Sequence, residues 1–80
     1  MLILYVKDHC IFSKKALDAV KRTHVPVTVK NRKEKGVMEE LSALQGSTEV
    51  PYMIDTETHR VINESDTIVE YLSSYAHRAE

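Results

Sequence analysis

Cysteine is scarce in this sequence, and Cys10 is the only one among 80 residues. A single cysteine excludes a disulfide bond within the chain and a zinc site built from several thiolates of one chain. The four histidines show no paired spacing typical of metal ligands, so we predict no metal site. Proteins without structural disulfides are typical of reducing compartments, and we therefore expect a cytoplasmic protein.

The sequence also lacks an excess of charge of one sign and a long apolar run. The formal net charge is -1 and the pI is about 6.4, which indicates neither a nucleic-acid partner nor an anionic membrane surface. No apolar stretch approaches the length that spans a bilayer, and residues 1–6 do not resemble a secretory signal. The length predicts one domain, residues 1–80, without repeats, and we expect a monomer.

The spacing of apolar residues predicts seven elements in the order β-α-β-α-β-β-α. Leu2–Val6 is typical of a central strand, residues 11–23 have helical spacing, and Pro26 predicts that Val25–Val29 is an edge strand. Residues 31–35 are predicted to form a solvated basic loop and the first turn of a helix that ends at Gly46, although Gly36 allows the helix to begin only there. The remaining predictions are a hairpin of strands 50–54 and 59–62, a helix from an Asn63 cap to about Tyr75, and frayed residues 77–80. Together they predict an α/β fold with a small mixed sheet and helices on both faces.

Cys10 lies where the first strand gives way to the first helix, in a C-x-x-S motif that ends at Ser13. Unpaired N–H groups at a helix start, together with Lys7 and protonated His9, favour the thiolate, which is the nucleophilic form. Most lone cysteines are instead small buried hydrophobes, but this position favours a reactive thiol. Because Ser13 cannot form a disulfide, an external thiol must resolve any adduct on Cys10, although the Ser13 hydroxyl can donate to the thiolate.

Two further segments leave alternatives open. Pro51 opens the third strand and is either a cis-proline beside a ligand or an ordinary trans-proline, and spacing alone favours trans. Residues 63–66 offer helix N–H donors and carboxylates that suit an amino-acid ligand, but the same residues are good helix caps.

Segments 5–13, 49–51 and 63–72 together resemble the glutaredoxin family, and more narrowly the thioredoxin-like N-terminal domain of glutathione-transferase-like glutaredoxins. The resemblance implies a thioredoxin-like fold, a cis-proline at Pro51 and glutathione as cosubstrate. It implies that Cys10 is the nucleophile and that Ser13 stands where a second cysteine is found. It also implies a glutathione site that consists of Lys7, Phe12, Val50, Pro51, Glu64, Ser65 and Asp66.

The resemblance implies a glutathione-dependent thiol–disulfide oxidoreductase that reduces glutathionylated proteins or small mixed disulfides by a monothiol mechanism. One alternative is a [2Fe–2S] cluster shared by two chains, which the absence of a C-G-F-S motif disfavours. Another is a non-catalytic module that binds glutathione or a protein partner. A transferase role is disfavoured because the sequence lacks the helical domain that forms the pocket for hydrophobic electrophiles. Ile11 departs from the Pro or Gly that usually follows the nucleophile, and Phe12 stands where Tyr is common.

Overall fold

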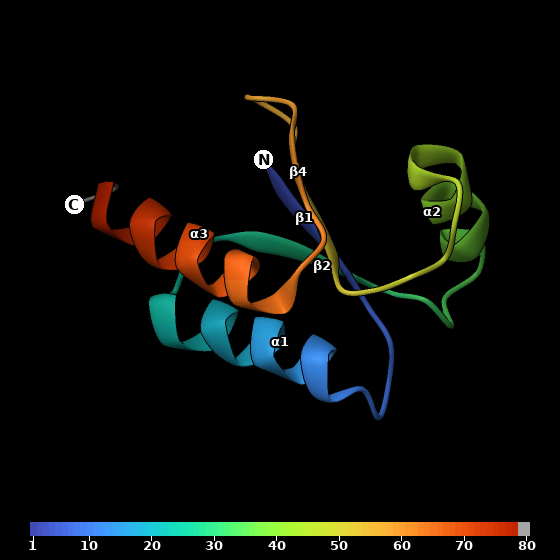
Figure 1. Cartoon of the computed structure of the whole chain (residues 1–80), viewed down its shortest axis with the longest axis horizontal. Coiled ribbons are helices and arrows are strands. Elements are labelled where there is room, and N and C mark those ends of the chain that lie inside the picture. Colours follow the sequence, from blue (N-terminus) through green and yellow to red (C-terminus); the bar gives the residue numbers. More distant parts are fainter. Residues whose placement is uncertain (79–80) are drawn as a thin grey trace.

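The computed structural model describes residues 1–78, and its central element is the apolar strand β1. The elements follow the order β1 (Leu2–Val6), α1 (Ile11–Thr23), β2 (Val27–Asn31), α2 (Val37–Gln45), β3 (Tyr52–Asp55), β4 (Arg60–Ile62) and α3 (Ser65–Arg78). Within the described residues these strands form a four-stranded mixed sheet (Figure 1). The predicted element order and α/β class are confirmed.

The sheet has the strand order β2-β1-β3-β4. β1 pairs in parallel with β2 and antiparallel with β3, and β3 and β4 form the predicted hairpin. The central position of β1 and the edge position of β2 are therefore confirmed. The predicted bounds of β2 are wrong by two residues, because the strand begins at Val27, after Pro26, which has no N–H to donate. Val25 precedes the strand but is buried in the core.

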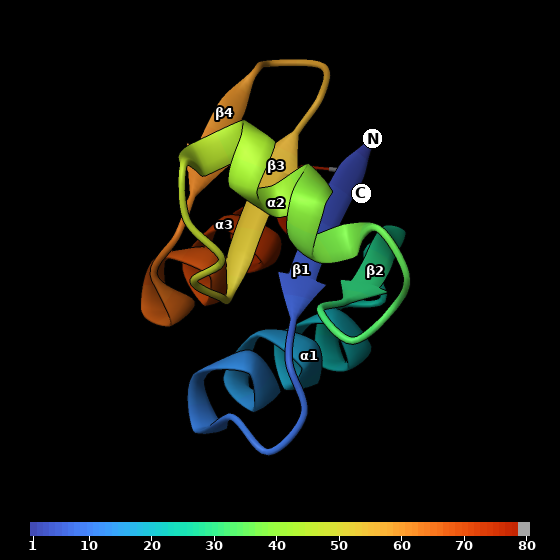
Figure 2. The same cartoon turned by 90° about the vertical axis from the view of Figure 1, so that its right-hand side faces the viewer.

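Helices cover both faces of the sheet, as predicted: α1 and α3 lie side by side on one face, and α2 covers the other (Figures 1 and 2). Successive side chains of β1 point to opposite faces, so this strand contributes to two clusters of buried residues. The first cluster consists of Leu2, Leu4, Val6, Ala16, Ala19, Val25, Met53, Ile62, Ile68 and Leu72. The second consists of Tyr5, Val37, Leu41 and Tyr52.

Left-handed residues mark three helix boundaries. His24, with φ 57°, follows α1 and donates its N–H to the Val20 carbonyl, so this helix ends before Pro26 is reached. Gly36 (φ 84°) precedes α2 and Gly46 (φ 78°) follows it, and the Gly46 N–H donates to Ser42 as predicted for a C-cap. None of the helices within residues 1–78 has the length and apolar content needed to cross a membrane.

The helix α3 differs from its prediction at both ends. It begins at Ser65, and the Glu64 carbonyl accepts the Ile68 N–H at 2.9 Å. Glu64 rather than Asn63 therefore occupies the N-cap position, because the N-cap carbonyl accepts the first helical hydrogen bond. The helix continues to Arg78, past the predicted end at Tyr75 and through part of the segment expected to fray. Residues 79–80 lie outside the described residues.

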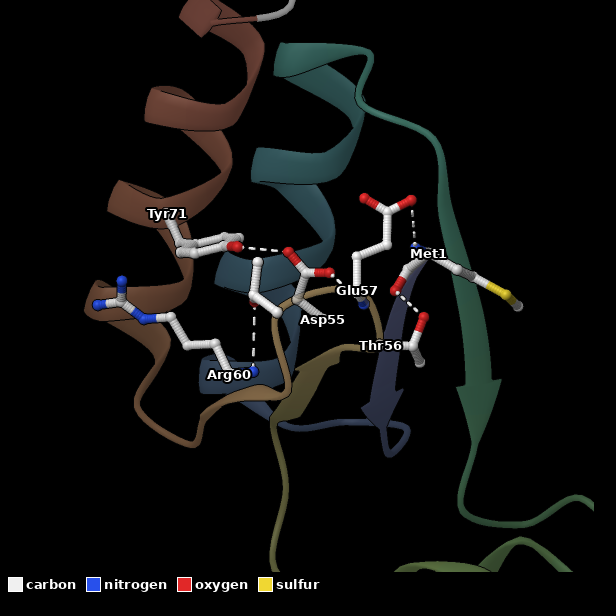
Figure 3. A network of polar contacts seen from close by, with 7 residues as sticks. Met1, Asp55, Thr56, Glu57, Arg60 and Tyr71 are labelled. Carbon is white, nitrogen blue, oxygen red and sulfur yellow. Dashed lines mark hydrogen bonds and ion pairs between the residues drawn. The ribbon is translucent and has the colours of Figure 1, made fainter.

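A network of polar contacts connects α3 to the end of the sheet that is remote from Cys10 (Figure 3). Asp55, at the end of β3, is only 4% exposed, and it accepts hydrogen bonds from the Tyr71 hydroxyl and the Glu57 N–H. The donation from Tyr71 is the main cause that lowers the pKa of Asp55. The Thr56 N–H and hydroxyl both donate to the Met1 carbonyl. The network fixes the direction of α3, the start of which lies at the other end of the sheet.

Candidate active site

The start of α1, the loop before β3 and the start of α3 meet at one end of the sheet (Figure 2). The Val50–Pro51 peptide bond is cis, as the resemblance implied, and the prediction of a trans bond from spacing alone is wrong. A hollow of about 300 Å³ at this end is lined by Phe12, Val50, Pro51, Asn63, Glu64, Ser65 and Asp66. Six of the seven residues predicted to bind glutathione therefore line one hollow. The seventh, Lys7, lines two neighbouring hollows.

Cys10 is the N-cap residue of α1. Its backbone is extended (φ -115°, ψ 119°), and its carbonyl accepts the first helical hydrogen bond from the Lys14 N–H at 2.9 Å. Its sulfur accepts the Ser13 N–H at 3.5 Å, which is one of the unpaired N–H groups of a helix start. The side chain is partly exposed. The thiol can therefore react with a ligand while the helix N-terminus stabilises its anion.

Ser13 is fully buried beneath the thiol. Its hydroxyl oxygen accepts the Lys7 N–H at 3.3 Å, which leaves the hydroxyl proton available to the sulfur. The pKa of Cys10 is lowered mainly by the Ser13 hydroxyl and then by the Ser13 N–H. Partial burial acts in the opposite direction, and the Phe12 N–H and the charge of Lys7 add the smallest contributions. The predicted direction of the pKa shift agrees, and the charge of Lys7, which was predicted to favour the thiolate, is the smallest of these causes.

The loop between β1 and α1 is tied to the loop that follows β2. The Asp8 carboxylate accepts from the Lys33 ammonium at 2.9 Å and from the Asn31 amide at 3.0 Å, and both interactions lower the pKa of Asp8. The Arg32 N–H donates to the Val6 carbonyl at 2.8 Å. These contacts hold the β1–α1 loop, which precedes Cys10, against the loop that follows β2.

The carboxylate of Asp66 is bound by a lysine of the neighbouring helix. The Lys15 ammonium lies 3.2 Å from Asp66 Oδ1, and both side chains are largely exposed. Ser65 beside it is only 8% exposed. Asp66 is one of the residues predicted to bind glutathione, and in the structure its carboxylate already accepts from an ammonium group. Sequence reasoning missed Lys15, because no local pattern links two residues on different helices.

A further hollow of about 220 Å³ shares Val50, Pro51 and Asn63 with the first. It is also lined by Lys7, Arg32, Gln45 and Glu49. The Arg32 guanidinium donates to the Thr48 carbonyl at 2.9 Å, and the Gln45 amide donates to the Glu49 carbonyl at 2.7 Å. Arg32 was predicted to lie in a solvated loop. Its place near Cys10 could have been predicted from the parallel pairing of the first two strands, because the carboxyl ends of parallel strands lie at the same edge of a sheet.

Residues 4–78 match the family described as Glutathione S-transferase, N-terminal domain. No curated protein sequence matches this chain. Among solved structures, a glutathione transferase homolog from Sulfitobacter with bound glutathione superposes with a TM-score of 0.74 at 19% identity. That match covers 99% of this chain and 38% of the Sulfitobacter chain.

Two glutaredoxins are also similar in structure. Glutaredoxin 2 from Salmonella typhimurium, in complex with glutathione, has a TM-score of 0.69 at 27% identity over 90% of this chain and 32% of its own. A glutaredoxin from Archaeoglobus fulgidus has a TM-score of 0.68 at 22% identity, and the match covers 86% of this chain and 82% of the Archaeoglobus chain. The chain therefore spans about two fifths or less of the Sulfitobacter and Salmonella proteins and most of the Archaeoglobus one. These similarities establish the thioredoxin-like fold that the sequence predicted.

Proposed function

The chain belongs to the glutathione S-transferase N-terminal domain family, and we propose that it acts as a glutathione-dependent thiol–disulfide oxidoreductase with Cys10 as its nucleophile. The observation that carries the proposal is the environment of Cys10: a partly exposed sulfur at a helix N-cap, faced by a buried hydroxyl and a backbone N–H. Such an environment favours the thiolate over the thiol, and the thiolate is the form that attacks disulfides.

Two adjoining hollows support the proposed position of glutathione. The γ-glutamyl end fits the hollow at the start of α3, where helix N–H groups suit its carboxylate and Asp66 suits its amine. The glycine carboxylate fits the hollow that contains Lys7 and Arg32, which offer positive charge. The shared residues Val50 and Pro51 lie between these ends, where the cysteinyl backbone of an extended tripeptide would pass. Bound glutathione in the Sulfitobacter and Salmonella proteins supports the same ligand for this fold.

The proposed reaction has two exchange steps. The Cys10 thiolate attacks the glutathione sulfur of a mixed disulfide, the old S–S bond breaks, and its electron pair leaves on the partner sulfur, which takes a proton from water. The product is a disulfide between Cys10 and glutathione. The thiolate of a second glutathione then attacks the sulfur of the bound glutathione, and oxidised glutathione leaves while the Cys10 thiolate is restored. Since Ser13 is not a thiol, it forms no bond in either step.

Transferase chemistry would instead require a protein group that stabilises the thiolate of glutathione itself. A hydroxyl could serve this purpose, but Ser13 is fully buried and its oxygen accepts the Lys7 N–H. The group exposed at the helix start is the Cys10 thiol, which is a nucleophile in its own right. Because the thiol is exposed and the hydroxyl is buried, the site favours oxidoreductase chemistry over transferase chemistry.

The proposal is tested by turnover of a small mixed disulfide, such as that of glutathione and 2-mercaptoethanol, in an assay coupled to glutathione reductase. Turnover that requires glutathione and is lost in Cys10→Ser is the expected result. Equal rates for the wild type and Cys10→Ser would contradict the proposal. A protein that binds glutathione in calorimetry without any turnover would also contradict it and would indicate a binding module.

A further inference from the structure

A third hollow, of about 470 Å³, lies against Cys10 and is formed by the β1–α1 loop and the first two turns of α1. The residues of its lining that matter here are Lys7, Cys10, Ile11, Lys14 and Leu17. Apart from Lys7, which also lines the hollow proposed for the glycine carboxylate, it contains no residue assigned above to the binding of glutathione. Its ligand is therefore a different group, although that group comes close to the same sulfur.

Part of this hollow is apolar. Ile11, directly after the cysteine, exposes 76% of its surface, and Leu17 lies half-buried two turns further along α1. A single exposed hydrophobic residue is ordinary on a protein surface. Here the exposed side chain lies beside a nucleophile and lines the same hollow, so a molecule that reaches the sulfur also covers apolar surface.

The charges around the hollow are predominantly positive. Lys7 and Lys14 both line it, and neither forms an ion pair with any residue that the structure describes. The one carboxylate of the lining, Asp8, is compensated by Lys33 at 2.9 Å. Asp18, one turn beyond Lys14 on α1, does not line the hollow. A ligand in this position therefore meets the uncompensated ammonium group of Lys14, with that of Lys7 between it and the proposed glycine carboxylate of glutathione.

Basic residues are concentrated in the part of the chain that contains the hollow. Nine of the eleven Lys and Arg residues lie before Gly36, but only three of the twelve Asp and Glu residues do. This part of the chain includes the β1–α1 loop, α1 and the start of the loop after β2, which is bound to the β1–α1 loop through Asp8. The balanced net charge of the whole chain conceals this separation. A local positive field of this kind attracts anionic ligands and accelerates their association.

We propose that this hollow receives the protein half of the mixed disulfide, and that it selects acidic segments with an apolar side chain next to the modified cysteine. The proposal rests on the proposed function, in which Cys10 attacks the glutathione sulfur. The partner's sulfur is bonded to that glutathione sulfur, so the residues that flank it lie within a few ångströms of Cys10 and cover the adjoining hollow. Lys7 and Lys14 favour carboxylates there, and Ile11 favours an apolar neighbour.

The first test does not depend on glutathione. The purified protein reacts with the anionic aromatic disulfide 5,5′-dithiobis(2-nitrobenzoate) and, in a parallel experiment, with the neutral 4,4′-dithiodipyridine. The ratio of the two rate constants cancels any change in the pKa of Cys10. Lys14→Glu should lower the ratio about five- to tenfold at low ionic strength, and added salt should reduce the effect. The matched control Lys21→Glu makes the same charge change further along α1 and should alter the ratio less than twofold, roughly.

The second test uses turnover. Two glutathionylated peptides with the same apolar residue beside the cysteine, flanked by Glu in one and by Lys in the other, are compared in kcat/KM. The acidic peptide should be reduced at least about tenfold faster at low ionic strength, and Lys14→Glu should abolish this preference. The mixed disulfide of glutathione and 2-mercaptoethanol, the leaving half of which is uncharged, should lose much less kcat/KM in Lys14→Glu than the acidic peptide does.

The outcomes separate the two proposals. Loss of all turnover, including that of the 2-mercaptoethanol mixed disulfide, would contradict the proposed function, but the reagent ratio would still report on the hollow. A reagent ratio that Lys14→Glu leaves unchanged, or that Lys21→Glu lowers equally, would overturn the inference. Equal kcat/KM for the two peptides in an active enzyme would overturn it as well.

Discussion

The buried hydroxyl of Ser13 gives the most specific prediction about Cys10. Ser13→Ala removes the group that contributes most to the lowered pKa of the thiol, but it keeps the Ser13 N–H that lies 3.5 Å from the sulfur. The substitution also leaves the Lys7 N–H without the acceptor that it has at 3.3 Å. We therefore expect an effect on the pKa and a separate effect on stability.

The magnitude follows from the energies of these hydrogen bonds. A hydrogen bond to a charged group contributes about 1.5 to 3 kcal/mol, and one pKa unit corresponds to about 1.4 kcal/mol. Because the backbone donor can partly compensate, we expect the loss of only part of this energy, and the pKa of Cys10 should rise. Below both pKa values the thiolate fraction, and with it the alkylation rate, should fall about tenfold. Above both values the rates should be nearly equal, because Ser13 forms no bond in the reaction.

The assay is the rate of alkylation by iodoacetamide between pH 4 and pH 10, roughly, on either side of the free-thiol pKa of about 8.5. Ser73→Ala, an exposed serine on α3, is the matched control and should have the wild-type midpoint. Urea unfolding should show a loss of about 1 to 3 kcal/mol in Ser13→Ala, because the Lys7 N–H loses its acceptor. An unchanged midpoint in a folded Ser13→Ala protein would refute the role of the hydroxyl. A wild-type midpoint at or above that of a free thiol would refute the reactive thiolate itself.

Three further predictions concern the contacts of α3. Tyr71→Phe should lower the free energy of unfolding by about 1 to 3 kcal/mol at neutral pH. Folding lowers the pKa of Asp55 below its ordinary 3.8, so the stabilisation by the Tyr71–Asp55 hydrogen bond is present above that value and is lost as the pH falls through the pKa of the folded protein. Urea titrations of wild type and variant should therefore converge in acid, and a constant difference would contradict the pairing. Lys15→Met should tighten glutathione binding roughly two- to fivefold in calorimetry, because the ligand amine no longer competes for Asp66, but it should not tighten binding of an analogue without that amine. Asp66→Asn or Ser65→Ala should raise the KM for glutathione about tenfold while Cys10 alkylation is unchanged; an unchanged KM with reduced thermal stability would mean that these residues only cap the helix.

The fold was predictable because its strands and helices have clear apolar periods. The apolar run Leu2–Val6 correctly predicted a central strand, and Pro26 correctly predicted an edge. The element bounds were less predictable, because strand pairing decides them. β2 begins at Val27, directly after Pro26, but it continues to Asn31 because that residue pairs with Val6, and no local feature of the sequence encodes this register.

The candidate site was predictable where its residues are close in sequence. Cys10 and Ser13 lie on one helical turn, so their spacing alone brought them together. The partners of Asp8 and Asp66 were not predictable, because Lys33 and Lys15 approach them only after separate elements have packed. The separation of charge along the chain was visible in the sequence, but the balanced total concealed it.

The central claim is that the Cys10 thiolate attacks the glutathione sulfur of a mixed disulfide. Its most direct test is the mass of the intact protein after reaction with one equivalent of a mixed disulfide between glutathione and a chromogenic thiol. The account predicts one glutathione on Cys10, one equivalent of released chromogenic thiol, removal of the adduct by free glutathione, and no reaction in Cys10→Ser. A protein that carries the chromogenic thiol instead of glutathione, or no adduct at all, would contradict it.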